Sequence, residues 1–71
     1  MVTVYAIEKN GDLFRVAGYN EETARKVVND ETVKYIVKSD KLIAVKNGVI
    51  IATSENIKYL INERVNTWKR F

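Results

Sequence analysis

The chain has 71 residues, of which 46% are hydrophobic, and its formal net charge is +3. It contains no cysteine and no histidine, which excludes disulfide bonds, the usual zinc sites, and Ser-His or Cys-His catalytic pairs. This length predicts a single domain, residues 1–71, with a small core that self-association would help to stabilise. No stretch resembles a signal peptide or a membrane span, so we expect a cytoplasmic protein.

Residues 2–18 predict a β-hairpin. Val2 and Val4 belong to an alternating pattern, and Asn10-Gly11 supplies the two positive-φ residues of a type I′ turn. The triplet Lys-Asn-Gly occurs a second time later in the chain. Because Asn-Gly is the strongest short hairpin signal, we interpret both copies as turns and not as a repeated functional unit.

Residues 20–30 predict a short helix. Asn20 is a favourable N-cap, and Glu21 falls in the first turn, where the helix dipole favours negative charge. An alternative extends this helix onward through Tyr35 and Ile36. We prefer the shorter helix because the sequence TVKYIV that follows is β-branched and aromatic with a period of two, as in a strand.

Residues 32–52 are therefore predicted to form a three-stranded meander, with a second Asn-Gly turn at residues 47–48. Residues 53–71 predict an amphipathic helix with Thr53 or Ser54 as its N-cap. The predicted order is ββαβββα. This order indicates an α+β fold, an antiparallel sheet of about five strands with two helices on one face.

The carboxylates do not predict a catalytic site. Glu21-Glu22 and Asp30-Glu31 are adjacent pairs, and neighbours in sequence do not point together on a helix. No phosphate-binding glycine motif occurs either. We therefore expect no enzymatic activity, no catalytic residue, no cofactor and no metal.

Four lysines of the meander form a candidate nucleic-acid site. Lys34 and Lys38 share one face of the predicted first strand, and Lys41 and Lys46 are close by in the meander. Tyr35 is predicted to point to the opposite face, so its ring would not stack a base beside these charges. Two interpretations stay open: lysines that keep exposed strands from pairing and aid solubility, which we prefer, or a platform for nucleic acid.

The predicted C-terminal helix carries residues that break its pattern. On a helical wheel, Arg64 falls inside the apolar stripe near Trp68, and Tyr59 falls on the opposite, polar face. Arg64 is either an arginine at the rim of the core or part of an exposed patch. Trp and Arg often dominate binding interfaces. The candidate partner-binding residues are Tyr59, Asn62, Arg64, Asn66, Trp68 and Phe71.

The function expected from these observations is protein binding without catalysis. Residues 1–31 are net acidic and residues 32–71 are net basic, which suggests a partner for one face. We expect a small regulator or inhibitor that covers a surface of a larger macromolecule. By analogy, compact inhibitors that phages and mobile elements encode against host defence have this character. The alternatives are a small basic nucleic-acid-binding protein and a subunit of a homodimer.

Overall fold

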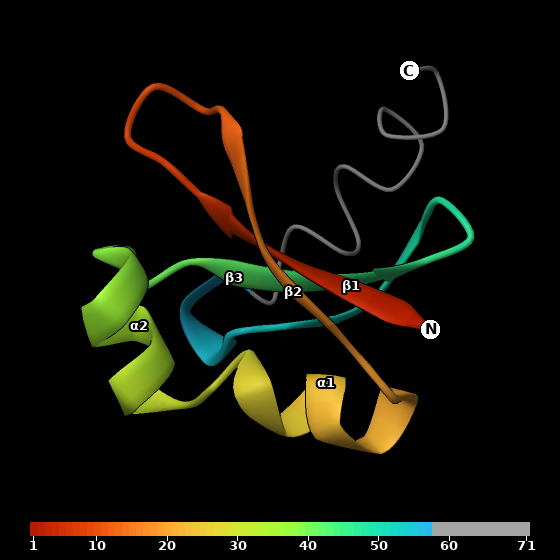
Figure 1. Cartoon of the computed structure of the whole chain (residues 1–71). Coiled ribbons are helices and arrows are strands. Elements are labelled where there is room, and N and C mark those ends of the chain that lie inside the picture. Colours follow the sequence, from red (N-terminus) through yellow and green to blue (C-terminus); the bar gives the residue numbers. More distant parts are fainter. Residues whose placement is uncertain (58–71) are drawn as a thin grey trace.

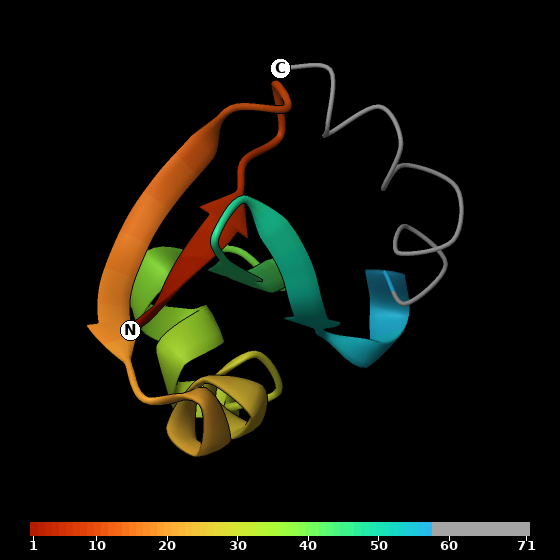
Figure 2. The same cartoon turned by 90° about the vertical axis from the view of Figure 1, so that its right-hand side faces the viewer.

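The protein is an antiparallel sheet with two short helices, seen in a computed structural model that describes residues 1–57 (Figures 1 and 2). Neighbouring strands are all antiparallel, in the order β2-β1-β3-β4 across the sheet. The predicted α+β class is confirmed, with four strands within residues 1–57 where about five were expected. The elements of this part are β1 (Val2–Ile7), β2 (Leu13–Tyr19), α1 (Glu21–Val27), α2 (Glu31–Val37), β3 (Leu42–Lys46), β4 (Val49–Thr53) and the 3-10 turn η1 (Glu55–Ile57).

Helix α2 stands where the sequence predicted a strand, so that prediction is wrong. The N-cap is Asp30, whose Oδ1 accepts hydrogen bonds from the backbone N–H groups of Thr32 and Val33 at 2.8 and 3.1 Å. Val33 and Val37 match a strand period of two, but they are also four residues apart and therefore share one helical face. Both are partly buried against the core. The pattern fits either structure, and the cap at Asp30 favours the helix.

The predicted cap of the first helix is confirmed. Oδ1 of Asn20 accepts the backbone N–H of Thr23 at 2.8 Å. Helix α1 ends at Val27, and α2 begins only four residues later. The chain therefore neither enters a strand nor continues as one long helix through Tyr35, but forms two separate short helices (Figure 1).

The two Lys-Asn-Gly turns differ. Asn47 and Gly48 have φ values of 53° and 78°, which confirms the type I′ turn between β3 and β4. In the first hairpin only Gly11 has positive φ, at 88°, so the predicted type I′ turn is wrong there. The N–H of Gly11 donates to the C=O of Glu8 and the N–H of Glu8 donates to the C=O of Asp12, both at 2.9 Å. These bonds define a three-residue loop with glycine at the bulge position.

The main core lies between the sheet and the two helices. Val33 and Val37 of α2 pack at its margin, so both described helices cover the same face of the sheet. A smaller cluster of Ile43, Ile50 and Ile57 belongs to the other face, because side chains alternate across a strand. The buried side chains of the main core are Val2, Val4, Ala6, Ala24, Val27, Val28, Leu42 and Ala44.

The helix predicted for residues 53–71 lies mostly outside the described residues. Within them the chain leaves β4 through Ser54, which is buried. Its Oγ accepts the N–H of Leu42 at 3.2 Å and donates to Oδ1 of Asn56 at 2.8 Å, while its C=O accepts the N–H of Ile57 at 3.1 Å. These bonds tie the beginning of η1 to β3.

Candidate protein-binding surface

The residues predicted to bind a protein partner lie in the part of the chain that the structure does not describe. These are Tyr59, Asn62, Arg64, Asn66, Trp68 and Phe71. Their predicted role stays a prediction. The candidate site that the structure does describe lies elsewhere, beside α2.

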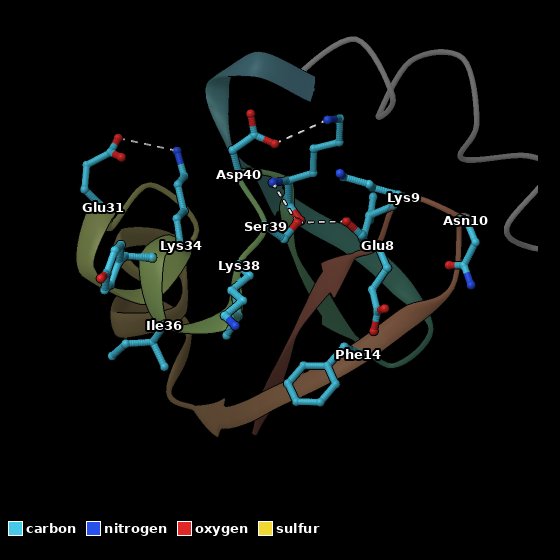
Figure 3. A pocket seen from close by; sticks show the side chains of 15 residues that line it. Glu8, Lys9, Asn10, Phe14, Glu31, Lys34, Ile36, Lys38, Ser39 and Asp40 are labelled. Carbon is cyan, nitrogen blue, oxygen red and sulfur yellow. Dashed lines mark hydrogen bonds and ion pairs between the residues drawn. The ribbon is translucent and has the colours of Figure 1, made fainter.

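An open hollow of about 1390 Å³ lies between α2 and the turn of the β1–β2 hairpin (Figure 3). We call it the α2 groove. It is lined by residues 7–11, Phe14, Glu31 and residues 34–41. The groove therefore joins segments that are distant in the sequence. These are the end of β1, the start of β2, and the second half of α2 with the segment that follows it.

Ser39 holds the two sides of the groove together. Its Oγ donates to the C=O of Ile7 at 2.8 Å and accepts the N–H of Lys41 at 3.2 Å. Its own N–H donates to the C=O of Lys34 at 3.1 Å, and the N–H of Ile7 donates to the C=O of Lys41 at 2.8 Å. Two of these bonds fix the segment after α2 to Ile7 at the end of β1, and the other two order that segment itself.

Lys38 ends α2 in an unusual backbone conformation. Its φ of 56° and ψ of 39° are left-handed, a region that glycine or asparagine usually occupies at the end of a helix. A lysine there is strained by about 1 kcal/mol. In Figure 3 its side chain lies between those of Ile36 and Phe14.

Three large apolar side chains of the α2 groove are exposed. The exposed fractions of Tyr35, Ile36 and Phe14 are 84%, 69% and 50%. Helix α2 contains no fully buried residue, although Val33 and Val37 touch the core. Apolar side chains grouped in this way on a small protein mark a surface that contacts another molecule more often than a scattered single residue does.

The groove carries charges of both signs. Nζ of Lys34 lies 3.7 Å from Oε1 of Glu31, and Nζ of Lys41 lies 3.2 Å from Oδ1 of Asp40. The hydrogen bond from Lys41 lowers the pKa of Asp40 below its usual value. Within residues 1–57, the remaining charged side chains of the groove have no ion-pair partner; these are Glu8, Lys9 and Lys38.

The structure brings together three of the four lysines that the sequence singled out. Lys34, Lys38 and Lys41 all line the α2 groove. Lys34 lies on helix α2, and the other two lie on the segment between α2 and β3, so the predicted strand face is not what brings them together. Tyr35 lines the same groove, so the prediction that it points away from these lysines is wrong. The groove is lined without interruption by residues 34–41, so it contains Tyr35 together with all three lysines.

Lys46 belongs to a different cluster. Its Nζ lies 3.3 Å from Oε1 of Glu21, and Nη2 of Arg25 lies 3.1 Å from Oε2 of the same carboxylate. Nη1 of Arg25 also donates to the C=O of Ile51 at 3.0 Å. Hydrogen bonds from Arg25 and then Lys46 lower the pKa of Glu21. Lys46 therefore ties α1 to the β3–β4 hairpin and is not part of the groove.

The chemistry available in the groove is that of contact and charge pairing. No group of three acidic side chains that would hold a metal ion occurs in the described part of the chain. Among residues 1–57, no helix is long and apolar enough to span a membrane.

No family model, curated protein or solved structure gives a significant match to the chain.

Sequence reasoning missed Phe14, Tyr35 and Ile36 as site residues. A local signal existed for the last two, because Asp30 followed by Glu31 has the composition of a helix start. Once α2 is a helix with Val33 and Val37 inward, Tyr35 must point outward. Phe14 had no local signal, because only the pairing of β1 with β2 and β3 brings it near α2.

Proposed function

We propose that the protein is a small non-enzymatic module that binds another protein through the α2 groove, as a regulator or inhibitor covering a surface of its target. The exposure of Tyr35 and Ile36 on a helix without a fully buried residue carries this proposal. Aromatic and aliphatic side chains surrounded by a polar rim are the usual centre of a protein interface. The proposal includes the cytoplasmic location expected from the sequence, and, by analogy, a role like that of phage or mobile-element inhibitors.

The charges of the groove favour a protein over a nucleic acid. Four lysines line it, but three carboxylates, Glu8, Glu31 and Asp40, lie among them. Phosphates bound there would be repelled by these carboxylates, whereas a protein surface can present both signs of charge. Exposed apolar side chains among charges of both signs are typical of a protein interface.

A nucleic acid is the second candidate, and one observation favours it. Tyr35 and Phe14 lie in the same groove as Lys34, Lys38 and Lys41. Exposed rings beside lysines are the elements that bind single strands by stacking and charge neutralisation. The presence of both elements in one groove keeps this candidate open.

The test is affinity capture from nuclease-treated lysate with the full chain as bait at nanomolar concentration. Tyr35→Ser and Ile36→Ser are expected to lower recovery of a specific protein by about ten-fold or more, because central interface residues contribute 1–2 kcal/mol each. Val49→Ser is the matched control, since Val49 is 42% exposed but does not line the groove. Equal recovery with all variants would refute the proposal.

The nucleic-acid candidate is tested separately by fluorescence anisotropy with single-stranded DNA and RNA oligonucleotides at low salt. Binding that weakens steeply with added salt, and that Tyr35→Ser reduces, would support this candidate. Absence of binding at 50 µM oligonucleotide, roughly the affinity range of non-specific sites, would eliminate it.

A further inference from the structure

The two Lys-Asn-Gly triplets carry the same chemically labile pair of residues. Asparagine is prone to spontaneous deamidation, above all before glycine, because the backbone nitrogen of glycine attacks the side-chain amide without hindrance from a Cβ. Asn10 and Asn47 are both exposed to water. Because the two copies share their local sequence, a large difference in reaction rate between them has to come from the fold.

The reaction needs an accessible backbone nitrogen and a side-chain amide that can turn toward it. The glycine nitrogen loses its proton and bonds to Cγ of the asparagine, the bond from Cγ to Nδ2 breaks, and ammonia leaves. Water then opens the resulting succinimide ring at either of its carbonyl carbons, which gives aspartate or isoaspartate. The product carries a new negative charge, and in isoaspartate the backbone runs through the side chain.

Hydrogen bonds hold both reacting groups in the first copy. The N–H of Gly11 donates to the C=O of Glu8 at 2.9 Å. The amide of Asn10 is held at both of its polar atoms, because Nδ2 donates to Oδ2 of Asp12 at 2.9 Å and Oδ1 accepts the N–H of Asp12 at 3.0 Å. The nitrogen and the amide have to leave these bonds before they can react.

The second copy lacks these restraints. Within residues 1–57, the N–H of Gly48 and the side chain of Asn47 have no counterpart of the hydrogen bonds found in the first copy. The turn type explains the difference, because a two-residue type I′ turn bonds the residues that flank it and leaves the N–H of its second residue without an acceptor. The next residue is Val49, which has no polar side chain to hold the amide.

We propose that Asn47 is the main site of spontaneous deamidation in this protein and that the loop of the first hairpin protects Asn10. Asn10 lines the α2 groove, whereas Asn47 does not (Figure 3). The reaction therefore leaves the charge of the groove unchanged and acts on the β3–β4 hairpin instead. This inference goes beyond the proposed function and does not depend on it.

Deamidation at Asn47 weakens the β3–β4 hairpin. The turn of Asn47 and Gly48 joins Lys46 and Val49, which are paired across the two strands. Isoaspartate adds a carbon atom to the backbone of this turn, and a type I′ turn does not accommodate it. The new carboxylate also competes for Lys46, whose Nζ lies 3.3 Å from Oε1 of Glu21. The deamidated form is therefore expected to have a lower urea midpoint.

The experiment is incubation of the full chain at neutral pH, with peptide mapping by mass spectrometry to give the rate at each asparagine. In the folded protein, Asn47 is expected to react about ten-fold faster than Asn10, a ratio that corresponds to about 1.4 kcal/mol in the barrier. In concentrated urea, where neither turn persists, the two rates should become similar. The deamidated form is separated by ion exchange, and its urea midpoint is compared with that of the original chain.

Two variants test the site and its restraint, and circular dichroism checks that both are folded. Asn47→Gly keeps a residue that accepts positive φ and is expected to abolish the main deamidated form. Asp12→Ala removes the acceptor of Nδ2 and is expected to raise the rate at Asn10 about three-fold while leaving Asn47 unchanged. Equal rates in the folded protein, a ratio that persists in urea, or no response to Asp12→Ala would each overturn the inference. An unchanged urea midpoint of the deamidated form would overturn the weakening of the hairpin.

Discussion

Helices α1 and α2 are both seven residues long and both begin at a capped, acidic first turn, but they differ in what they bury. Helix α1 and its C-cap bury Ala24, Val27 and Val28. Helix α2 buries no residue fully. Two helices with similar N-terminal caps thus differ in how much apolar surface they bury. The cause lies in the side chains that follow each cap.

Three inward residues at positions i, i+3 and i+4 give α1 a continuous apolar stripe, and the alanine lets it approach the sheet closely. It packs against β1, β2 and β4. On α2 only Val33 and Val37 face inward, and Tyr35 and Ile36 remain in solvent. Helix α1 therefore stabilises the fold, whereas the outer surface of α2 is left exposed and available for the binding proposed above.

A matched pair of aspartate substitutions tests the difference between α1 and α2 with the largest expected effect on stability. Val28→Asp places a charge where the side chain is 1% exposed, and we expect it to lower the free energy of unfolding by about 4 kcal/mol, enough to unfold a domain of this size. Ile36→Asp on the exposed side of α2 is expected to change it by about 0.5 kcal/mol or less. Urea unfolding followed by circular dichroism measures both. Similar losses would show that α2 is as structural as α1.

The two helix caps give a smaller effect. Asn20→Ala and Asp30→Ala each remove a side-chain acceptor from backbone N–H groups, and each is expected to cost about 1 kcal/mol of stability. Because α1 carries the core, Asn20→Ala should lower the urea midpoint of the whole domain. Asp30→Ala should in addition raise amide hydrogen exchange within α2 more than elsewhere. Uniform exchange in both variants would contradict the comparison.

The sequence predicted most of the sheet because the signals there are local. The alternation in β1 and the Asn-Gly turn at Asn47 can be interpreted without any distant contact. The start of α1 was equally local, because Asn20 is followed directly by two acidic residues. Helix α2 was predicted as a strand because Val33 and Val37 satisfy both a spacing of two and a spacing of four. Asp30 resolves the ambiguity, but it was interpreted as the end of the preceding helix.

The candidate site was predictable only in part. The sequence places Lys34, Lys38 and Lys41 near one another, because they are close along the chain whatever the local structure. Their relation to Tyr35 was wrong because it depends on the helix. Phe14 and the loop at Lys9 reach the groove through strand pairing and through the hydrogen bonds of Ser39, and no local pattern encodes such contacts.

Lys38→Gly sharpens the comparison by separating stability from binding on α2. Glycine adopts the left-handed conformation without strain, so this change is expected to stabilise the fold by as much as about 1 kcal/mol. The same change removes a positive charge from the α2 groove and should weaken capture of the proposed protein partner. A rise in the urea midpoint together with lower recovery of the partner in affinity capture is the expected result. A lower midpoint would mean that the lysine side chain itself supports the fold.

The smallest effect concerns the anchoring of α1 by charge. The pKa of Glu21 is lowered in the folded protein, first by the hydrogen bond from Arg25 and then by Lys46. Because the folded state binds this proton more weakly than the unfolded chain, the stabilisation is complete above the ordinary pKa of glutamate. It is lost as the pH falls through the lowered folded value. Exposure of the pair to solvent makes the effect small and sensitive to salt.

Glu21→Gln removes this linkage and tests it. At neutral pH the variant should be slightly less stable than the original chain, and the difference should disappear as the pH falls below the ordinary range of a glutamate. Glu22→Gln is the control on the same helix, because its contact with Lys26 is longer, at 3.8 Å, and more exposed. Urea midpoints measured from neutral pH into the acid range, at low and high salt, give the comparison. An unchanged difference at acid pH would show that Glu21 acts through packing and not through its charge.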